Sequence, residues 1–227
     1  MPPPSAHTFP VTNRTWIHES LAGGEDARKA LWRQLMDLYN WPLQAHVSAT
    51  ALGAYGEPAD LVNGFFADRL VANGYLEAWQ ASGKRLRTWL ANGLWFYARE
   101  RRRSERRHLG TGASLDDLPD QQPDVGVALD RAFAHTVTQL AIEQAERECE
   151  SDGLANHWTC FLAHHCHGRP YRELAESLGV TAGRAAVMAR TASTRFRAAV
   201  RRLVELDGIE RHRVDRAIQA IVDSLQT

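Results

Sequence analysis

Hydrophobic positions in the first hundred residues recur with the spacing of an α-helix. From about Glu25 they are separated by three to five residues, at Leu31, Leu35, Leu38, Leu43 and Val47. This spacing predicts a helix with a kink or break at Pro42, because proline removes a backbone donor. Residues 59–70 predict a short amphipathic helix. Residues 73–84 carry Asn-Gly and Ser-Gly pairs and predict a loop.

Residues 86–108 predict the third helix of this part of the chain. On a helical wheel, five residues form the expected buried face: Leu86, Leu90, Gly93, Leu94 and Tyr97. Trp89 and Phe96 flank this face and are expected to be half-buried. Trp95 falls on the far side, in line with three arginines: Arg99, Arg102 and Arg106.

The second half of the chain contains a linker and then more helices. Residues 109–130 hold five glycines and prolines, five aspartates and no basic residue, which predicts an acidic linker. We find no alternating strand pattern, so the chain is predicted to be all-α, with two small helical domains. The expected segments are a disordered 1–15, a first domain 16–108, the linker 109–130, a second domain 131–206 and a C-terminal helical extension 207–227.

Residues 170–206 have the pattern of a helix-turn-helix. Pro170 suits a first helical turn, Ala175 precedes Gly179 by four residues, and Thr181 is a good N-cap for the second helix. One side of that helix carries a stripe of apolar residues, most of them small: Ala185, Ala189, Ala192, Phe196, Ala199 and Leu203. Its opposite side carries Arg184, Val187, Arg190, Thr191, Thr194 and Arg201, residue types that contact bases and phosphates in a major groove. The alternative is a solvated basic helix in a bundle.

The formal net charge is zero, but the charge is unevenly distributed. Nine basic residues lie between Lys84 and Arg107 against two glutamates, which gives this segment a charge of plus seven. A tryptophan in line with arginines is typical of surfaces that stack unpaired bases and hold phosphates. The alternative is that Trp95 packs on the linker or on the second domain.

These features together resemble the extracytoplasmic-function (ECF) sigma factors of bacterial RNA polymerase. The matching segments are "YNWPLQAHV" at 39–47, "EPADLVNGFFADRL" at 57–70, "KRLRTWLANGLWFYARERRR" at 84–103 and "PYRELAESLGVTAGRAAV" at 170–187. The resemblance implies a sigma region 2-like bundle that docks on the clamp helices of the largest polymerase subunit and captures the melted minus-10 element. It also implies a region 4-like domain that reads the minus-35 duplex, and an anti-sigma protein as a possible regulator.

The expected site residues follow from the two patterns and the resemblance. DNA contacts are expected from Trp95, Arg99, Arg102, Arg106, Arg184, Val187, Arg190, Thr191 and Arg197. Polymerase contacts are expected from Asp60, Leu61, Phe65 and Arg69. The chain departs from the usual family pattern at Asn63-Gly64, Phe96 and Ala186. Two alternatives therefore stay open: a stand-alone helix-turn-helix regulator, and a polymerase-docking adaptor that needs a further partner for targeting.

A cluster of histidines and cysteines at 157–167 is the remaining chemical signal. Cys160, His164 and Cys166 could contribute to a zinc site, but their spacing matches no known closed site, so we expect no metal and no other cofactor. The sequence contains no motif of a known enzyme class, which favours a non-enzymatic protein. It lacks a signal-peptide pattern and a long apolar run, so we expect a cytoplasmic protein without a membrane partner.

Overall fold

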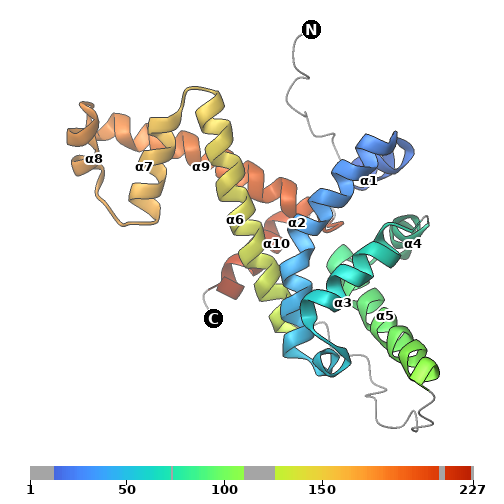
Figure 1. The fold of residues 1–227 in the computed structure, drawn as a ribbon. Coiled ribbons are helices and arrows are strands. Elements are labelled where there is room, and N and C mark those ends of the chain that lie inside the picture. The colour runs from blue at the N-terminus through green and yellow to red at the C-terminus, as the bar shows by residue number, and fades with distance from the viewer. Residues whose placement is uncertain (1–12, 73, 110–125, 210–212, 226–227) are drawn as a thin grey trace. The chain divides into compact units, whose positions relative to one another are not determined.

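The computed structural model describes residues 13–72, 74–109, 126–209 and 213–225, and within these ranges every regular element is a helix (Figure 1). The all-α prediction is confirmed for this part of the chain. Residues 1–12 of the segment expected to be disordered lie outside the described residues, and residues 13–15 begin the first helix. The helices are α1 (Asn13–Ala22), α2 (Glu25–Ala49), the 3-10 helix η1 (Ala51–Tyr55), α3 (Pro58–Phe65), the π-helix η2 (Phe66–Leu70), α4 (Tyr75–Ser82), α5 (Leu86–Leu109), α6 (Val127–Ser151), α7 (Ala155–His165), α8 (Tyr171–Leu178), α9 (Ala182–Leu206) and α10 (Val214–Leu225).

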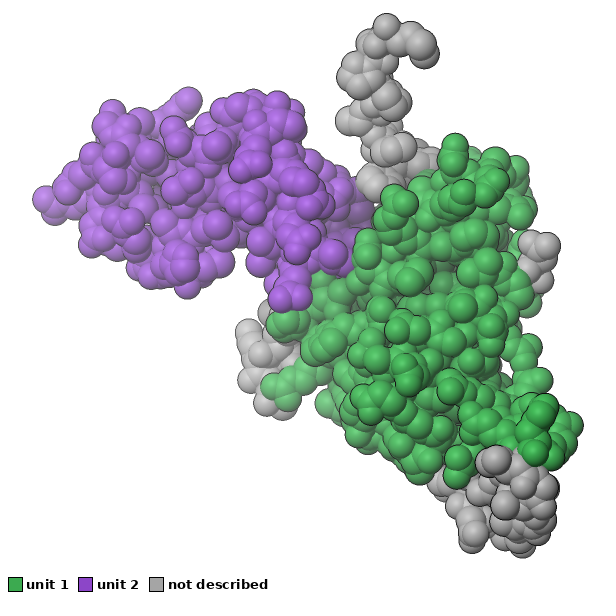
Figure 2. All heavy atoms as spheres, viewed as in Figure 1, with its two compact units in different colours: residues 1–136, 205–227 green, residues 137–204 purple. Residues whose placement is uncertain are grey.

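The chain forms two compact units, coloured separately in Figure 2. Unit 1 comprises residues 1–136 and 205–227, and unit 2 comprises residues 137–204. Helix α6 begins at Val127, inside the segment expected to be a linker, and its first turns belong to unit 1. Helix α9 ends in unit 1, and the C-terminal extension belongs there too. Unit 2 is therefore an insertion in unit 1, connected to it through α6 and α9.

The core of unit 1 is built around α2. The five apolar residues that predicted this helix are fully buried, which confirms its inward face: Leu31, Leu35, Leu38, Leu43 and Val47. Helix α2 continues through Pro42 without the expected break. It contacts α1, η1, α3 and α5. None of the described helices combines the length and the apolar character needed to span a bilayer.

The loop predicted for residues 73–84 is wrong, because Tyr75–Ser82 forms helix α4. Gly74 and Gly83 adopt left-handed conformations, with φ of 89° and 67°, at the two ends of the helix. The glycines that suggested a loop therefore terminate a short helix instead. Trp79 of α4 is fully buried, and its indole Nε1 donates a hydrogen bond to the Lys84 carbonyl at 2.9 Å.

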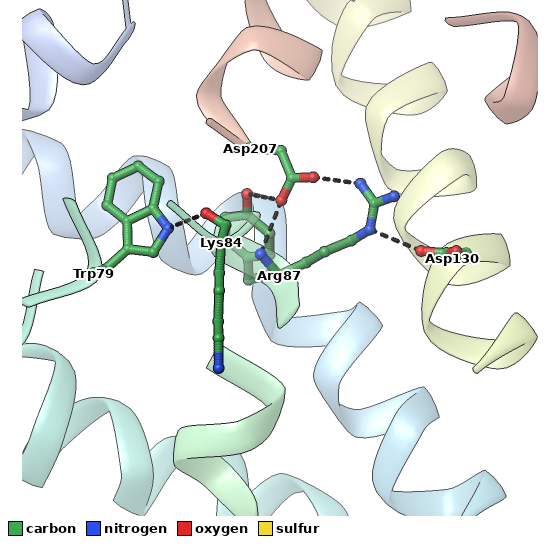
Figure 3. A network of polar contacts seen from close by, with 6 residues as sticks. Trp79, Lys84, Arg87, Asp130 and Asp207 are labelled. Atoms are coloured by element: carbon green, nitrogen blue, oxygen red, sulfur yellow. Dashed lines mark hydrogen bonds and ion pairs between the residues drawn. The ribbon is translucent and has the colours of Figure 1, made fainter. Parts of the chain in front are cut away.

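A buried polar cluster fixes the start of α5 (Figure 3). Arg87, which is only 7% exposed, forms an ion pair with the fully buried Asp207, and its Nε lies 2.7 Å from Asp130 of α6. Asp207 also accepts hydrogen bonds from the Arg87 backbone N–H at 2.8 Å and from the Tyr39 hydroxyl at 3.1 Å. Although burial alone would lower the pKa of Arg87, the two carboxylates raise it, so the guanidinium stays charged.

In unit 2, α7 and α9 pack against the later turns of α6, and α8 packs against α7 and α9. Two groups of buried side chains fill it, one around Leu174 and Ala185 and the other around Trp158 and Phe161. Two ion pairs stabilise the packing of α9. Arg202 pairs with Glu148 of α6 at 2.5 Å, and Arg195 pairs with Asp152, the residue after α6, at 2.7 Å.

Candidate nucleic-acid interfaces

Helix α5 buries a wider face than the helical wheel predicts. Trp95, expected to be exposed, is only 6% exposed, whereas Phe96 is 60% exposed. The prediction that Trp95 shares a solvent-facing stripe with the arginines is therefore wrong. A second row of positions is buried as well: Arg87, Ala91, Trp95 and Ala98. The guanidinium of Arg99 lies 4.6 Å from the centre of the Trp95 ring and contributes to its cover.

The arginines of α5 also differ from the predicted stripe. Arg99 and Arg102 are half-buried, and Arg102 lies 3.8 Å from Glu105. Nothing is described of the Arg106 side chain. Arg103 and Arg107 are exposed, so positive charge does reach the surface of this helix, though at positions other than those expected.

Next to Phe96 the surface of unit 1 contains a groove of about 440 Å³. Its lining brings together four aromatic rings and three charged side chains: Tyr75, Trp89, Phe96, Tyr97, Arg69, Lys84 and Glu100. Arg69 and Glu100 form an ion pair. The rings offer surfaces for stacking, and the cations can hold phosphate.

Glycine at position 93 allows the groove to have this shape. A Cβ atom there would lie 2.0 Å from the Tyr75 hydroxyl. The Tyr75 ring is 5.8 Å from the Trp89 ring, centre to centre. The Tyr75 hydroxyl and the Trp89 Nε1 are buried and hydrogen-bond to no other described protein group. Burial raises the pKa of Tyr75, so its hydroxyl keeps its proton. The sequence prediction missed this groove, and the glycine inside an otherwise helical pattern was the available signal.

The residues expected to contact polymerase divide into two pairs. Leu61 and Phe65 are 1% and 0% exposed, so their assignment to a polymerase-facing surface is corrected: both are core residues of unit 1. Asp60 and Arg69 are exposed. Val62 and Phe66 are buried as well, so both apolar sides of this helical segment pack inward.

Gly64, which departs from the usual family pattern, has a structural role. A Cβ atom at this position would lie 2.4 Å from the Tyr97 hydroxyl. Tyr97 is 9% exposed, and burial raises the pKa of its hydroxyl, with a smaller contribution from Asp68. Gly64 thus makes room for the Tyr97 ring that lines the groove.

The helix-turn-helix of unit 2 has the predicted turn. Gly179 is left-handed with φ of 64°, and the Thr181 Oγ1 accepts a hydrogen bond from the Arg184 N–H at 3.2 Å, as an N-cap does. Pro170 lies just before α8, as its N-cap residue rather than within its first turn. The predicted inner stripe of α9 is confirmed: Ala185, Ala189, Ala192, Ala199 and Leu203 are buried and Phe196 is half-buried.

The outer face of α9 presents most of the predicted DNA contacts. Arg184, Val187, Arg190 and Arg197 are exposed, with Val187 at 47%. Thr191 is half-buried, and its hydroxyl donates to the Val187 carbonyl at 3.0 Å. The exposed surface therefore consists of cations around an apolar side chain, a composition suited to phosphates and thymine methyl groups.

The histidine and cysteine cluster is spread over different environments. Cys160 is buried in unit 2, and burial raises the pKa of its thiol. The His164 ring stacks on Tyr171 at 3.8 Å, and its Nδ1 lies 2.9 Å from the Arg169 carbonyl. Cys166 is exposed. Within the ranges that the structure describes, no three such side chains meet in a group that could hold a metal ion.

Comparisons of the chain with protein-family models, with curated proteins and with solved structures found no match.

Proposed function

We propose that the protein is a sigma factor of the ECF kind, a non-enzymatic cytoplasmic subunit that binds core RNA polymerase and directs it to promoters. The observation that carries the proposal is the groove of unit 1, where exposed and half-buried aromatic rings lie beside cations. In this proposal the groove holds the unpaired strand of the minus-10 element. The helix-turn-helix of unit 2 reads the minus-35 duplex.

The chemistry of the groove supports strand capture. A base that leaves the duplex loses its stacking partner, and the exposed Phe96 ring can replace that partner. Lys84 supplies positive charge for the backbone, whereas the charge of Arg69 is balanced by Glu100. This revises the expected site, because Phe96 takes the stacking role that the sequence assigned to Trp95.

The chemistry of α9 supports reading of duplex DNA. Its N-terminal half exposes Arg184, Val187 and Arg190, which lie on one side of the helix at intervals of three residues. Arginine can bind guanine through two hydrogen bonds, and a valine methyl can contact thymine. The acidic counterparts that would neutralise this face are missing from residues 181–202 of the sequence.

One observation favours the alternative of a stand-alone regulator that binds DNA without polymerase. Two of the four residues expected to face polymerase, Leu61 and Phe65, are buried in unit 1. The remaining surface candidates on this side, Asp60 and Arg69, are charged, and Arg69 is paired with Glu100. An apolar docking surface on α3 is therefore smaller than the sequence predicts.

A transcription experiment distinguishes a sigma factor from a stand-alone regulator. Core polymerase and the full chain would be mixed with a library of random promoter sequences, and the transcripts sequenced. We expect a stable complex and transcripts that start downstream of a shared two-part sequence. The Phe96→Ala variant should lose opening of the start region, whereas Met36→Ala, a change at another exposed apolar residue, should not. The sigma proposal fails if no complex with polymerase forms, or if the same transcripts appear without the protein.

A further inference from the structure

The buried cluster around Arg87 joins three segments of unit 1 that are far apart in the sequence. Asp130 is in the first turns of α6, which continue into unit 2, and Asp207 directly follows α9, which returns from unit 2. The side chain of Arg87 pairs with both carboxylates (Figure 3). One guanidinium therefore attaches the start of α6 and the segment that follows α9 to α5.

Further contacts attach the same two segments to unit 1. The Leu86 N–H donates to the Asp207 carbonyl at 3.0 Å. Gly208 lies against Trp79 so closely that a Cβ atom would come within 2.7 Å of the indole ring. On the α6 side, the Phe133 ring stacks on Tyr39 at 5.7 Å, and the Arg87 guanidinium lies 4.8 Å from the Phe133 ring centre.

Because both carboxylates bind the same guanidinium, the two attachments share one partner. Asp207 is fully buried, so the loss of Arg87 would leave a carboxylate without a counterion in an apolar surrounding. Removing one partner of a buried ion pair strongly destabilises the folded protein, because the remaining charge stays buried without a counterion. Release of either segment would change the position and solvation of the guanidinium that binds the other, so we expect the two attachments to be coupled.

We propose that Arg87, Asp130 and Asp207 form a latch that holds or releases the start of α6 and the end of α9 together. With the latch closed, the start of α6 and the segment that follows α9 are both fixed to α5. With the latch open, both segments are released from α5. This goes beyond the proposed function, and its test uses the protein alone, so a failed transcription experiment leaves it standing.

The test measures the release of each segment after a change in the other. Spin labels would be placed at Ser48→Cys on α2 and Val127→Cys on α6, two exposed positions in unit 1, in a Cys166→Ser background. Asp207→Asn changes a residue far from α6 in sequence. It should nevertheless broaden the distance distribution between these labels and shift it to longer distances.

The reciprocal measurement follows the amides that contact Asp207. Asp130→Asn should accelerate hydrogen exchange at Leu86 and Arg87 at least about tenfold, and Asp207→Asn should do so more than about 100-fold. The matched control is Asp152→Asn, which removes an α9 ion pair within unit 2 and should change neither readout.

Two results would overturn the latch. In the first, folded Asp207→Asn protein keeps the wild-type label distances. In the second, Asp130→Asn loosens α6 while exchange at Leu86 and Arg87 stays unchanged, which would mean that the two attachments are independent. If Asp207→Asn fails to fold, the Asp130→Asn arm decides alone, because the Asp130 side chain is 50% exposed and its loss is tolerable.

Discussion

Replacement of Trp95 and of Phe96 by alanine should have opposite consequences, although the two residues are neighbours on α5. Trp95 is 6% exposed, so Trp95→Ala removes nearly all of a buried indole and leaves a cavity, at a cost of about 3–5 kcal/mol in the free energy of unfolding. Phe96 is 60% exposed and has less than half of its surface to lose, which amounts to about 1 kcal/mol. For binding of single-stranded DNA the order reverses. Phe96→Ala should weaken binding by about 1–3 kcal/mol, or roughly 5- to 150-fold.

Urea unfolding followed by tryptophan fluorescence suits the first part, because six of the seven tryptophans lie in unit 1. With a denaturant dependence of roughly 2 kcal/mol per molar, Trp95→Ala should lower the midpoint by about 1.5–2.5 M and Phe96→Ala by about 0.5 M. Binding of a fluorescent oligonucleotide would be measured on the folded variants. The assignment of Trp95 to the core and of Phe96 to the surface would be refuted if Trp95→Ala left the urea midpoint nearly unchanged while Phe96→Ala lowered it strongly.

Three further predictions concern other positions. Gly64→Ala gains about 1 kcal/mol of helix propensity but displaces the Tyr97 hydroxyl, so we expect a net loss of about 1–2 kcal/mol in urea unfolding; a gain would mean that Tyr97 moves freely. Burial lowers the pKa of His46, so unit 1 should be fully stable above pH 6.5 and lose stability as the pH falls below it; His46→Leu should remove that loss between pH 7 and pH 5. Arg184→Ala should cost about 1–3 kcal/mol at one base position of the upstream element, whereas an equal loss at every sequence would mark a phosphate contact.

The helix-turn-helix could be predicted from sequence because its signals are local. The left-handed turn needs a glycine, which Gly179 supplies, and the N-terminus of α9 needs a side-chain acceptor, which Thr181 supplies. Both requirements are met within a few residues of the turn. The inner stripe of α9 was equally predictable, because small apolar residues recur there at helical spacing.

The surface of α5 could not be predicted in the same way, because its second buried row begins with a charged residue. A helical wheel places Trp95 opposite the expected buried face, and it gives no reason to bury a charged residue such as Arg87. Arg87 is buried only because Asp130 and Asp207 neutralise it, and the second of these is 120 residues away in the chain. The same applies to Gly64, which looked like a departure from a family pattern until the Tyr97 ring was found against it.

The insertion of unit 2 into unit 1 sets the order in which the newly made chain can fold. A ribosome that adds about 5–20 residues per second needs roughly 6–24 s to proceed from Arg87 to Asp207. During that interval the α2–α5 bundle carries an arginine without its main counterion, while all of unit 2 is synthesised. The first helices to leave the ribosome are therefore among the last to complete their packing, and binding factors that recognise nascent chains have their best access to unit 1 in this period.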